Sequence, residues 1–305
     1  SRARGYSGML QVDLTRPGVW AVLFPKAMDL MRHLETVTQR PQWSFGGGTV
    51  LMLRINHRQS KDIDLFVPDP QYLGYVNPRL SDAAESITTE YEENAEFIKL
   101  MLPEGEIDIV VGEPLTRNPY EIVDFDSQQI RVETNAEIIA KKMWHRGDRC
   151  KARDLFDLCA VAKSDPAALV DIAPFVSKHG LKFLAVLRDR ESFLRREFEA
   201  IDALDFKDSF DVCVEVGRRV IACAMNRQDL LDQSQVSSGR FIGPIVAFES
   251  GVALQRVNAK GDHACHSLAA LTHPVALGDP VDITYKMGIG VVNGHGPNRS
   301  TELGR

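Results

Sequence analysis

The sequence predicts an α+β protein, in which a mixed sheet with helices is followed by a helical bundle and a small all-β module at the C-terminal end. Three changes of pattern along the 305 residues predict this class. Short strand-like and helical segments alternate in residues 1–132, and long helical periodicity dominates residues 133–230. Residues 238–293 carry short β-type runs that glycine and proline interrupt, and we expect a disordered tail at 294–305.

The composition excludes several classes of protein. Hydrophobic residues make up 44% and charged residues 26%, which is typical of globular chains, and the length suits about two domains. The net charge of −6 argues against binding polyanions by overall charge, so any nucleic-acid contact requires a local basic patch. The five cysteines lack C-x-x-C spacing, which predicts reduced thiols rather than disulfides or a zinc site. No apolar run approaches the ~20 residues of a membrane span and no secretory signal is expected, so we predict a cytoplasmic protein.

The first part of the chain combines both kinds of secondary structure. Phe24-Pro25-Lys26 opens a predicted helix, because the apolar residues that follow recur with helical spacing. In residues 62–67 and 106–111, apolar side chains alternate with polar ones, which is the period of a strand with one buried face. Further strands are predicted at 43–45, 97–102 and 129–132, and a short buried helix at 49–55.

Helices are predicted for the middle of the chain and strands for its end. Thr134-Asn135-Ala136-Glu137 is a capping-box sequence, which predicts a helix from this point to Arg146. The apolar spacing predicts further helices at 153–162, 181–201 and 210–225. The strands predicted for the C-terminal module are 244–248, 252–257, 281–285 and 289–292.

Three aspartates carry the strongest chemical signal. Asp62 and Asp64 lie two residues apart on a predicted strand, so their side chains project from the same face. Two carboxylates so placed repel each other unless a cation lies between them, and a hard ion such as Mg²⁺ prefers oxygen ligands. Asp108 is alone in an apolar alternating strand and would reach the same ions if the two strands are neighbours. Three carboxylates holding two metals can orient and neutralise a triphosphate during in-line displacement.

A glycine triplet, Gly46 to Gly48, precedes these aspartates. Glycine allows backbone amides to approach phosphate closely, and a helix starting at Thr49 would direct its positive end there. Each feature alone has a simpler interpretation: a plain tight turn, a loop boundary at Asp62 and Asp64, or a half-exposed strand residue at Asp108. Their order and spacing together favour a phosphate and metal site.

Two segments resemble a known superfamily. These are Phe45 to Arg54, FGGGTVLMLR, and His57 to Phe66, HRQSKDIDLF, and they resemble the polymerase-β-like nucleotidyltransferases, most closely the AbiEii/AbiGii-type toxin nucleotidyltransferases. The resemblance extends to EIIAKKM at 137–143 and RDLFDL at 153–158, which look like the lysine helix and the R-D-x-x-D-L helix of that family. Together the matching segments cover roughly residues 25 to 165.

The resemblance implies a nucleotide-binding turn. Gly47, Gly48 and Thr49 match the phosphate-binding turn of the family, whose fold is a mixed sheet with helices. Arg58 and Ser60 precede the carboxylates, where the family often has arginine and serine. The long stretch between the second and third carboxylates departs from the family pattern, because residues 68–80 look like an inserted loop, and this leaves the substrate side undetermined.

The resemblance also implies catalytic roles. Asp62 and Asp64 match the metal ligands, and Asp108 would be the third carboxylate, which polarises or deprotonates the attacking hydroxyl. Lys142 aligns with the lysine expected to meet the triphosphate, and Asp154 with the acidic residue of the last motif.

Basic residues are concentrated on the predicted lysine helix and just after it. Lys142, Arg146 and Arg149 lie within neighbouring turns, and Lys151 and Arg153 follow them. Such a stretch is commonly a solvated charged face. Beside a metal–triphosphate site it favours contact with phosphate or an RNA backbone, so Lys142 and Arg146 are predicted to contact the nucleotide.

The two acidic residues of the R-D-x-x-D-L segment have two interpretations. Asp154 and Asp157 either act in catalysis or form ion pairs with Arg153 or Arg146 that orient the helix. The sequence leaves both open.

The sequence therefore predicts an enzyme that moves a nucleoside monophosphate from an NTP to an acceptor with Mg²⁺ or Mn²⁺. Similarity to the toxin family implies tRNA as acceptor, a toxin–antitoxin or phage-defence role and a cognate antitoxin as partner, with no membrane involved. Two alternatives remain: transfer to a small molecule or a protein, and a non-catalytic module of the same fold that binds RNA or protein. The segment 238–292 resembles the KfrB-type domain of plasmid-borne proteins, which implies a binding role.

Overall fold

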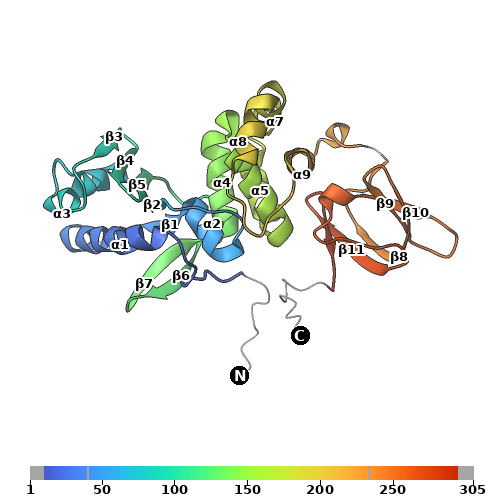
Figure 1. Cartoon of the computed structure of the whole chain (residues 1–305), viewed down its shortest axis with the longest axis horizontal. Helices are drawn as coiled ribbons and strands as arrows, with labels where there is room; N and C mark the ends of the chain where they lie inside the picture. The colour runs from blue at the N-terminus through green and yellow to red at the C-terminus, as the bar shows by residue number, and fades with distance from the viewer. Residues whose placement is uncertain (1–9, 40, 233, 295–305) are drawn as a thin grey trace. The chain divides into compact units, whose positions relative to one another are not determined.

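The computed structural model describes residues 10–39, 41–232 and 234–294 (Figure 1). The chain divides into two compact units, of which the first comprises the residues up to 138 together with 202–207 and the second comprises 139–201 and the residues from 208 onward. A short segment far along the chain, 202–207, thus belongs to the first unit. Apart from its first residue, the predicted tail at 294–305 lies outside the described residues.

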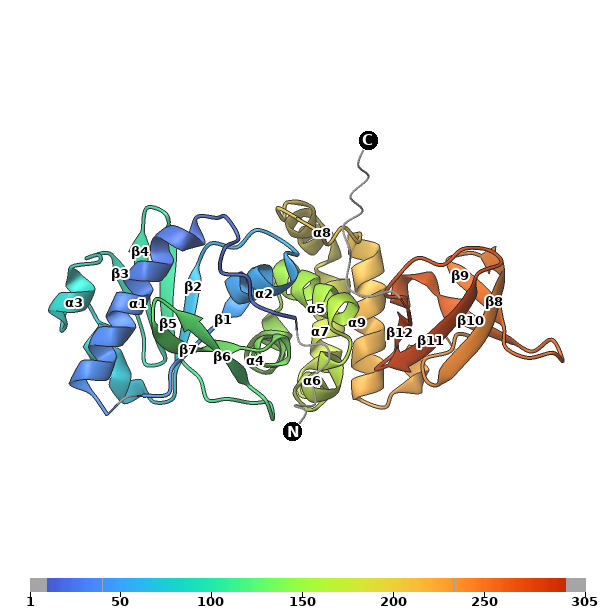
Figure 2. The ribbon, with the colours of Figure 1, turned by 90° about the horizontal axis from the view of Figure 1, so that it is seen from below.

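The first unit is built on a mixed seven-stranded sheet (Figure 2). The strands are ordered β3-β4-β5-β2-β1-β7-β6, and the pairs β2–β5 and β1–β7 are parallel. The remaining neighbours are antiparallel. The strands are β1 Ser44–Gly46, β2 Ile63–Val67, β3 Tyr91–Glu93, β4 Phe97–Leu102, β5 Gly105–Val111, β6 Tyr120–Phe125 and β7 Gln128–Glu133.

Helix α1, Trp20–Val37, lies along one face of this sheet and packs on β2 and β5 (Figure 2). It begins earlier than predicted, because Trp20, Leu23 and Phe24 are buried on the stripe that continues along the helix. Pro25 therefore lies inside the helix rather than at its start, where it leaves one backbone hydrogen bond unmade. The other helices of this part are α2 Gly47–Ile55, the 3₁₀ turn η1 Pro70–Val76, α3 Asp82–Glu85 and the start of α4 Asn135–Arg146.

The inner strand β4 and the edge strand β6 show what the sequence pattern detected and what it missed. The strand predicted at 97–102 is β4, whose apolar residues alternate as expected. The edge strand β6 was not predicted, because its residues are only partly buried or exposed, and Ile122 points its apolar side chain to solvent.

The second unit holds most of the helices. Helix α5 is almost entirely buried, and α9 packs against α5, α6 and α7. The single helix predicted at 181–201 is two helices, because Arg190 leaves the helical conformation between them. The helices are the rest of α4, η2 Gly147–Arg149, α5 Ala152–Ser164, α6 Ala168–Val176, α7 Gly180–Asp189, α8 Glu191–Glu199, α9 Phe210–Ala224 and η3 Gln228–Leu230.

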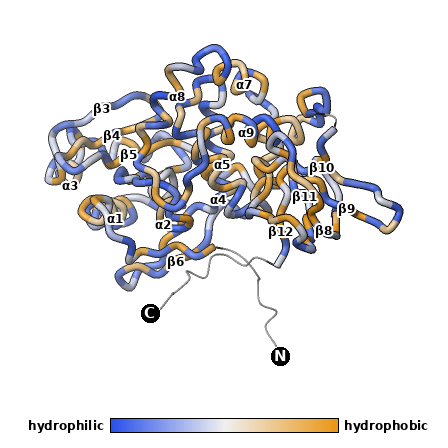
Figure 3. Tube along the Cα trace, turned by 45° about the vertical axis from the view of Figure 1, so that its right-hand side comes forward, coloured by the Kyte–Doolittle hydropathy of each residue, from blue (hydrophilic) through white to orange (hydrophobic). Residues whose placement is uncertain are grey.

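The C-terminal module is a separate five-stranded antiparallel sheet, in the order β10-β9-β8-β11-β12. Figure 3 shows apolar residues gathered on β8, β11 and β12, and Ile245, Ile283 and Val292 lie in their common core. The strands are β8 Arg240–Glu249, β9 Val252–Arg256, β10 His263–Ser267, β11 Pro280–Lys286 and β12 Ile289–Val292, with the short turn η4 Leu268–Ala270. The mixed sheet, the helices and this separate sheet confirm the predicted α+β class.

A buried arginine joins the module to helix α9. Arg219 is 0% exposed, and its guanidinium donates to the carbonyl oxygens of Gly288 (3.1 Å) and Val236 (2.7 Å). It also donates to Oε1 of Gln235 over 3.1 Å. Burial and the charge of Arg219 lower the pKa of His266 to about 4, so this core histidine is neutral at ordinary pH.

None of the described helices combines the length and the apolar stretch that crossing a bilayer requires.

Candidate active site

Two of the predicted carboxylates are cross-strand neighbours. Asp64 on β2 lies directly opposite Asp108 on the parallel strand β5, so both project from the same face of the sheet. On the far side of each aspartate, Gly46 of β1 pairs with Asp64 and Lys99 of β4 pairs with Asp108. The opposite face of the same two strands is apolar core, formed by Ile63, Leu65, Ile107 and Ile109.

The position of Asp108 makes ionisation costly. Burial raises the pKa of Asp108 to about 7, and the charge of Asp64 adds to this rise while Lys99 opposes it. The Oδ1 atom of Asp108 is buried and has no hydrogen-bond partner among the described residues. A carboxylate oxygen in such surroundings gains from a cation, since burying an uncompensated charge is unfavourable.

Asp62 lies one residue before β2 and contacts the start of β5. Its Oδ1 accepts a hydrogen bond from the amide of Glu106 over 2.9 Å. Its negative charge adds to the rise in the pKa of Asp108. Asp62 thus holds the ends of the two catalytic-site strands together as well as adding charge.

The carboxylates of this site supply only part of the coordination that a cation needs. Within the described ranges, no three His, Cys, Asp or Glu side chains are grouped so that they could hold a metal ion. The pair Asp64 and Asp108 fits a hard cation, because both supply carboxylate oxygens and one of these oxygens is buried without a donor. Additional oxygen ligands would be required to complete its coordination.

The glycine turn lies against Asp64. Gly47 has φ +75°, and a β-carbon added to it would lie 1.9 Å from Oδ2 of Asp64, so only glycine fits there. Gly46 is the N-cap of α2, and a β-carbon at this position would lie 2.0 Å from Oε1 of Glu133. Helix α2 begins at this turn and has no acidic residue in its first turn. No side chain of that turn therefore offsets the positive end of the helix dipole.

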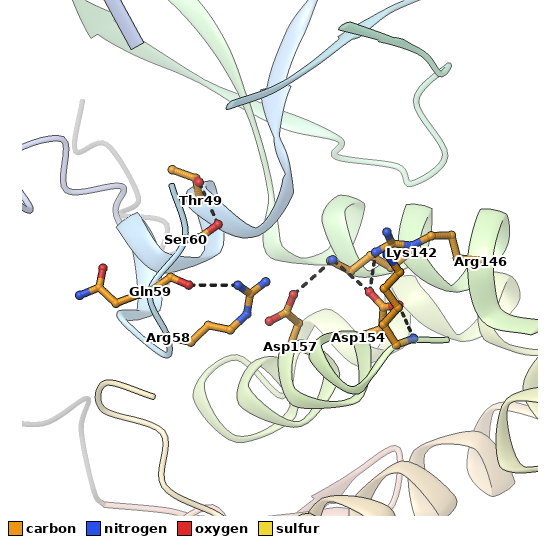
Figure 4. A network of polar contacts seen from close by, with 9 residues as sticks. Thr49, Arg58, Gln59, Ser60, Lys142, Arg146, Asp154 and Asp157 are labelled. Carbon is orange, nitrogen blue, oxygen red and sulfur yellow. Dashed lines mark hydrogen bonds and ion pairs between the residues drawn. The ribbon is translucent and has the colours of Figure 1, made fainter. Parts of the chain in front are cut away.

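Polar side chains connect this turn to the loop before β2 (Figure 4). Thr49 is completely buried, and its Oγ1 lies 2.5 Å from the carbonyl oxygen of Asp62 and 3.0 Å from Oγ of Ser60. A hydroxyl has one hydrogen, so Thr49 donates to the carbonyl and accepts from Ser60. Arg58 is buried, and its Nη2 lies 2.6 Å from where a β-carbon of Gly48 would be. Thr49 and Ser60 fasten the turn, and Arg58 places its guanidinium beside it.

One structural component of this site carried no sequence signal. The loop at 56–59 pairs with residues 202–205, which lie between α8 and α9 in the chain but belong to the first unit. Apart from one side-chain hydrogen bond between Asn56 and Asp205, the pairing uses backbone atoms, which leave no residue pattern in the sequence. Glu133 was missed for a similar reason, because only the parallel pairing of β1 and β7 brings it over Gly46.

The acidic residues of α5 form ion pairs with the lysine helix in the second unit (Figure 4). Nζ of Lys142 lies 3.2 Å from Oδ1 of Asp154 and 3.2 Å from Oδ2 of Asp157. Arg146 also contacts Oδ1 of Asp154, and the amide of Lys151 donates to its Oδ2. Burial alone would raise the pKa of Asp154, but Lys142, Arg146 and this amide hold it below its usual range.

Of the two roles that the sequence leaves open for the acidic residues of α5, the structure shows the ion pairs. Asp154 forms ion pairs with Lys142 and Arg146, and Asp157 forms one with Lys142. Lys142, predicted to meet the triphosphate, is only 11% exposed in its side chain and lies between two carboxylates. These ion pairs hold helix α4 against helix α5, which is a structural role independent of any part that the residues play in catalysis.

The basic residues that follow the lysine helix, Arg149, Lys151 and Arg153, are exposed. The side chain of Arg149 is 78% exposed and approaches Asp148. The charge of Arg153, followed by burial and the charge of Arg146, lowers the pKa of Lys151. Such mutual repulsion identifies a concentration of positive charge on the second unit.

Comparison with known proteins agrees with these features. The family description "Nucleotidyl transferase AbiEii toxin, Type IV TA system" matches residues 29–222, which is more than half of the chain. Among curated proteins, no sequence matches this chain.

Two solved structures are similar to it at low identity. A candidate nucleotidyltransferase from H. pylori is 16% identical with a TM-score of 0.36, covering 70% of this chain and 99% of its own. An antigenic nucleotidyltransferase-like protein from Paracoccidioides brasiliensis is 13% identical with a TM-score of 0.28, covering 57% of this chain and 92% of its own. Because these TM-scores are low, the assignment rests on the family match, and the chain belongs to the AbiEii family of nucleotidyltransferase toxins of type IV toxin–antitoxin systems.

Proposed function

We propose that this enzyme moves a nucleoside monophosphate from an NTP to an acceptor hydroxyl or phosphate, with Mg²⁺ or Mn²⁺ as cofactor. The observation that carries the proposal is the placement of Asp64 opposite Asp108, with the glycine turn at Gly47 against the carboxylate of Asp64. Acidic side chains and a helix N-terminus beside one another can receive a cation and the phosphates it accompanies.

The carboxylates hold the cation and handle a proton. Asp64 and Asp108 supply ligands, and Asp62 adds the third carboxylate of the proposed metal site. The cation, when bound, neutralises and orients the triphosphate. Asp108, on the same face of the sheet as Asp64, is proposed to polarise or take the proton of the attacking hydroxyl.

Positively polarised groups bind the phosphates in this proposal. In the first unit, amides at Gly47 and Gly48 and the guanidinium of Arg58 flank the turn, while Thr49 and Ser60 hold its shape. In the second unit, Lys142 and Arg146 are proposed to contact the nucleotide during turnover, with Asp154 holding them in position. Lys142 must then exchange one of its ion pairs for a phosphate contact.

The acceptor is proposed to be tRNA, and the protein to act in the cytoplasm as a toxin with a cognate antitoxin. The exposed positive charge of Arg149, Lys151 and Arg153 supports a nucleic-acid acceptor, because these side chains can neutralise backbone phosphates on a protein of net charge −6. Family membership supports the antitoxin. Transfer to a small molecule or a protein is the alternative.

The decisive experiment incubates the full chain with each labelled NTP, Mg²⁺ and total tRNA. Labelled tRNA is expected, a labelled small molecule or protein would support the alternative acceptor, and no label with no NTP binding would contradict transferase activity. Asp64→Asn should abolish labelling. The matched control is Asp69→Asn, because Asp69 caps the turn η1 through its side chain and asparagine can replace it there.

A further inference from the structure

A four-residue segment, 202–205, pairs through its backbone with the loop that precedes strand β2, and we call this segment the strap. The amide of Gln59 donates to the carbonyl oxygen of Asp202 over 2.8 Å. The amide of Leu204 donates to the carbonyl oxygen of His57 over 2.9 Å. These two bonds form an antiparallel bridge within the first unit, although the strap is preceded and followed in the chain by residues of the second unit.

A side chain extends this pairing to the end of helix α2. The amide of Asp205 donates to the carbonyl oxygen of Asn56 over 2.9 Å, and Nδ2 of Asn56 donates to Oδ2 of Asp205 over 3.1 Å. Asn56 has the left-handed conformation, φ 49°, that ends α2. Phe206, directly after the strap, is buried. The strap is therefore anchored at both ends rather than resting loosely on the loop.

The two ladder bonds flank Arg58. Arg58 lies directly opposite Ala203 in the bridge, between the bonded residues His57 and Gln59. The guanidinium of Arg58 lies beside Gly48 of the glycine turn. The backbone of this arginine is thus held on both sides by a segment that is distant in the sequence.

We infer that the strap is a positioning element that sets the affinity for the NTP by holding Arg58 beside the turn; this inference rests on the proposed function. Without the ladder bonds, the backbone of the loop would sample further conformations. Only a fraction of molecules would then present Arg58 correctly, and the apparent dissociation constant rises in inverse proportion to that fraction. The chemical step, which depends on the carboxylates, would change little once NTP is saturating.

Two proline substitutions test this inference in the full chain. Leu204→Pro removes the amide that donates to His57, whereas Ala203→Pro is the matched control, because the amide of Ala203 takes no part in the ladder. For the NTP that labels the acceptor, Leu204→Pro is expected to raise Kd and KM about tenfold and to leave kcat within about twofold. Ala203→Pro should bind like the wild type. Unchanged binding by Leu204→Pro would overturn the inference.

A side-chain cycle covers the case in which Leu204→Pro does not fold. Asn56→Ala, Asp205→Ala and the double variant should each weaken NTP binding, and the two single effects should not add, because both remove one hydrogen bond. Asp205→Asn keeps an acceptor and should bind normally. If the wild type binds NTP but the two single variants bind it normally, or their effects add, the inference about the strap is wrong. Absence of NTP binding by the wild type would instead refute the proposed function and this inference with it.

Discussion

Asp64 and Asp108 lie directly opposite each other on the neighbouring parallel strands β2 and β5. Two carboxylates side by side, one of them with a buried oxygen that lacks a donor, oppose folding in the absence of a cation. Function rather than stability therefore explains the pair. The same strands have completely buried apolar side chains on their other face, and this core supports the unfavourable contact.

The first prediction concerns pH. The pKa of Asp108 is raised to about 7 in the folded chain, so between about pH 4 and 7 the native state keeps a proton that the unfolded state has lost. The free energy of unfolding should therefore fall as pH rises through this window and level off above it. Asp108→Asn should remove this fall and gain about 4 kcal/mol at pH 8, since each pKa unit corresponds to about 1.4 kcal/mol.

Denaturant unfolding of both proteins at several pH values, without divalent ions, measures the effect. Mg²⁺ with NTP should stabilise the wild type at pH 8 but not Asp108→Asn. Parallel stability profiles of the two proteins between pH 4 and 8 would contradict the prediction.

The second prediction concerns the glycine turn. Gly47→Ala places a methyl group on Oδ2 of Asp64 and should reduce transfer at least about a hundredfold, since small displacements at a reacting centre cost this much. Gly251→Ala is the matched control, because Gly251 has a similar φ of +79° but nothing within 4 Å of the added carbon. Both variants should lose about 1 kcal/mol of stability from the left-handed conformation, and Gly47→Ala should lose more, because its methyl group meets Asp64. Equal activity of the two variants would show that Asp64 does not need its present position.

The third prediction separates structure from catalysis at Lys142. Lys142→Met removes one cation from beside the buried carboxylates of Asp154 and Asp157, and should cost about 3 kcal/mol of stability. Lys142→Met combined with Asp157→Asn should regain much of this loss, because Arg146 still pairs with Asp154. If Lys142 contacts the NTP, the double variant stays inactive although it is stable. Recovery of transfer together with stability would limit Lys142 to a structural role.

The fourth prediction concerns the attachment of the C-terminal module. Arg219→Met removes donors from the carbonyl oxygens of Gly288 and Val236, and should destabilise the chain by about 3–5 kcal/mol. Arg227→Met is the control, since Arg227 forms an exposed ion pair with Asp229, and should cost at most about 1 kcal/mol. Urea unfolding of both variants measures the difference. A similar loss in the two would show that the buried guanidinium contributes little.

Local patterns in the sequence predicted the sheet unit, the helices and the module, because the periods of strands and helices are written in consecutive residues. The strand at 97–102 and the alternation around Asp64 and Asp108 are of this kind. The edge strand β6 and the break at Arg190 were not predicted, because partial burial and a single non-helical residue leave little periodic signal.

The order of residues along the chain was enough to place Asp62, Asp64 and a glycine turn in the pattern of a nucleotidyltransferase, and to put Asp108 on a strand of its own. Three further relationships became visible in the folded chain: Asp108 is the direct neighbour of Asp64, Lys142 pairs with Asp154 and Asp157, and the strap at 202–205 pairs with the loop of Arg58. The reason is physical. Which strand pairs with which, and which backbone amide finds which carbonyl, depends on contacts between residues far apart in the chain, and such contacts leave no periodic trace in the sequence.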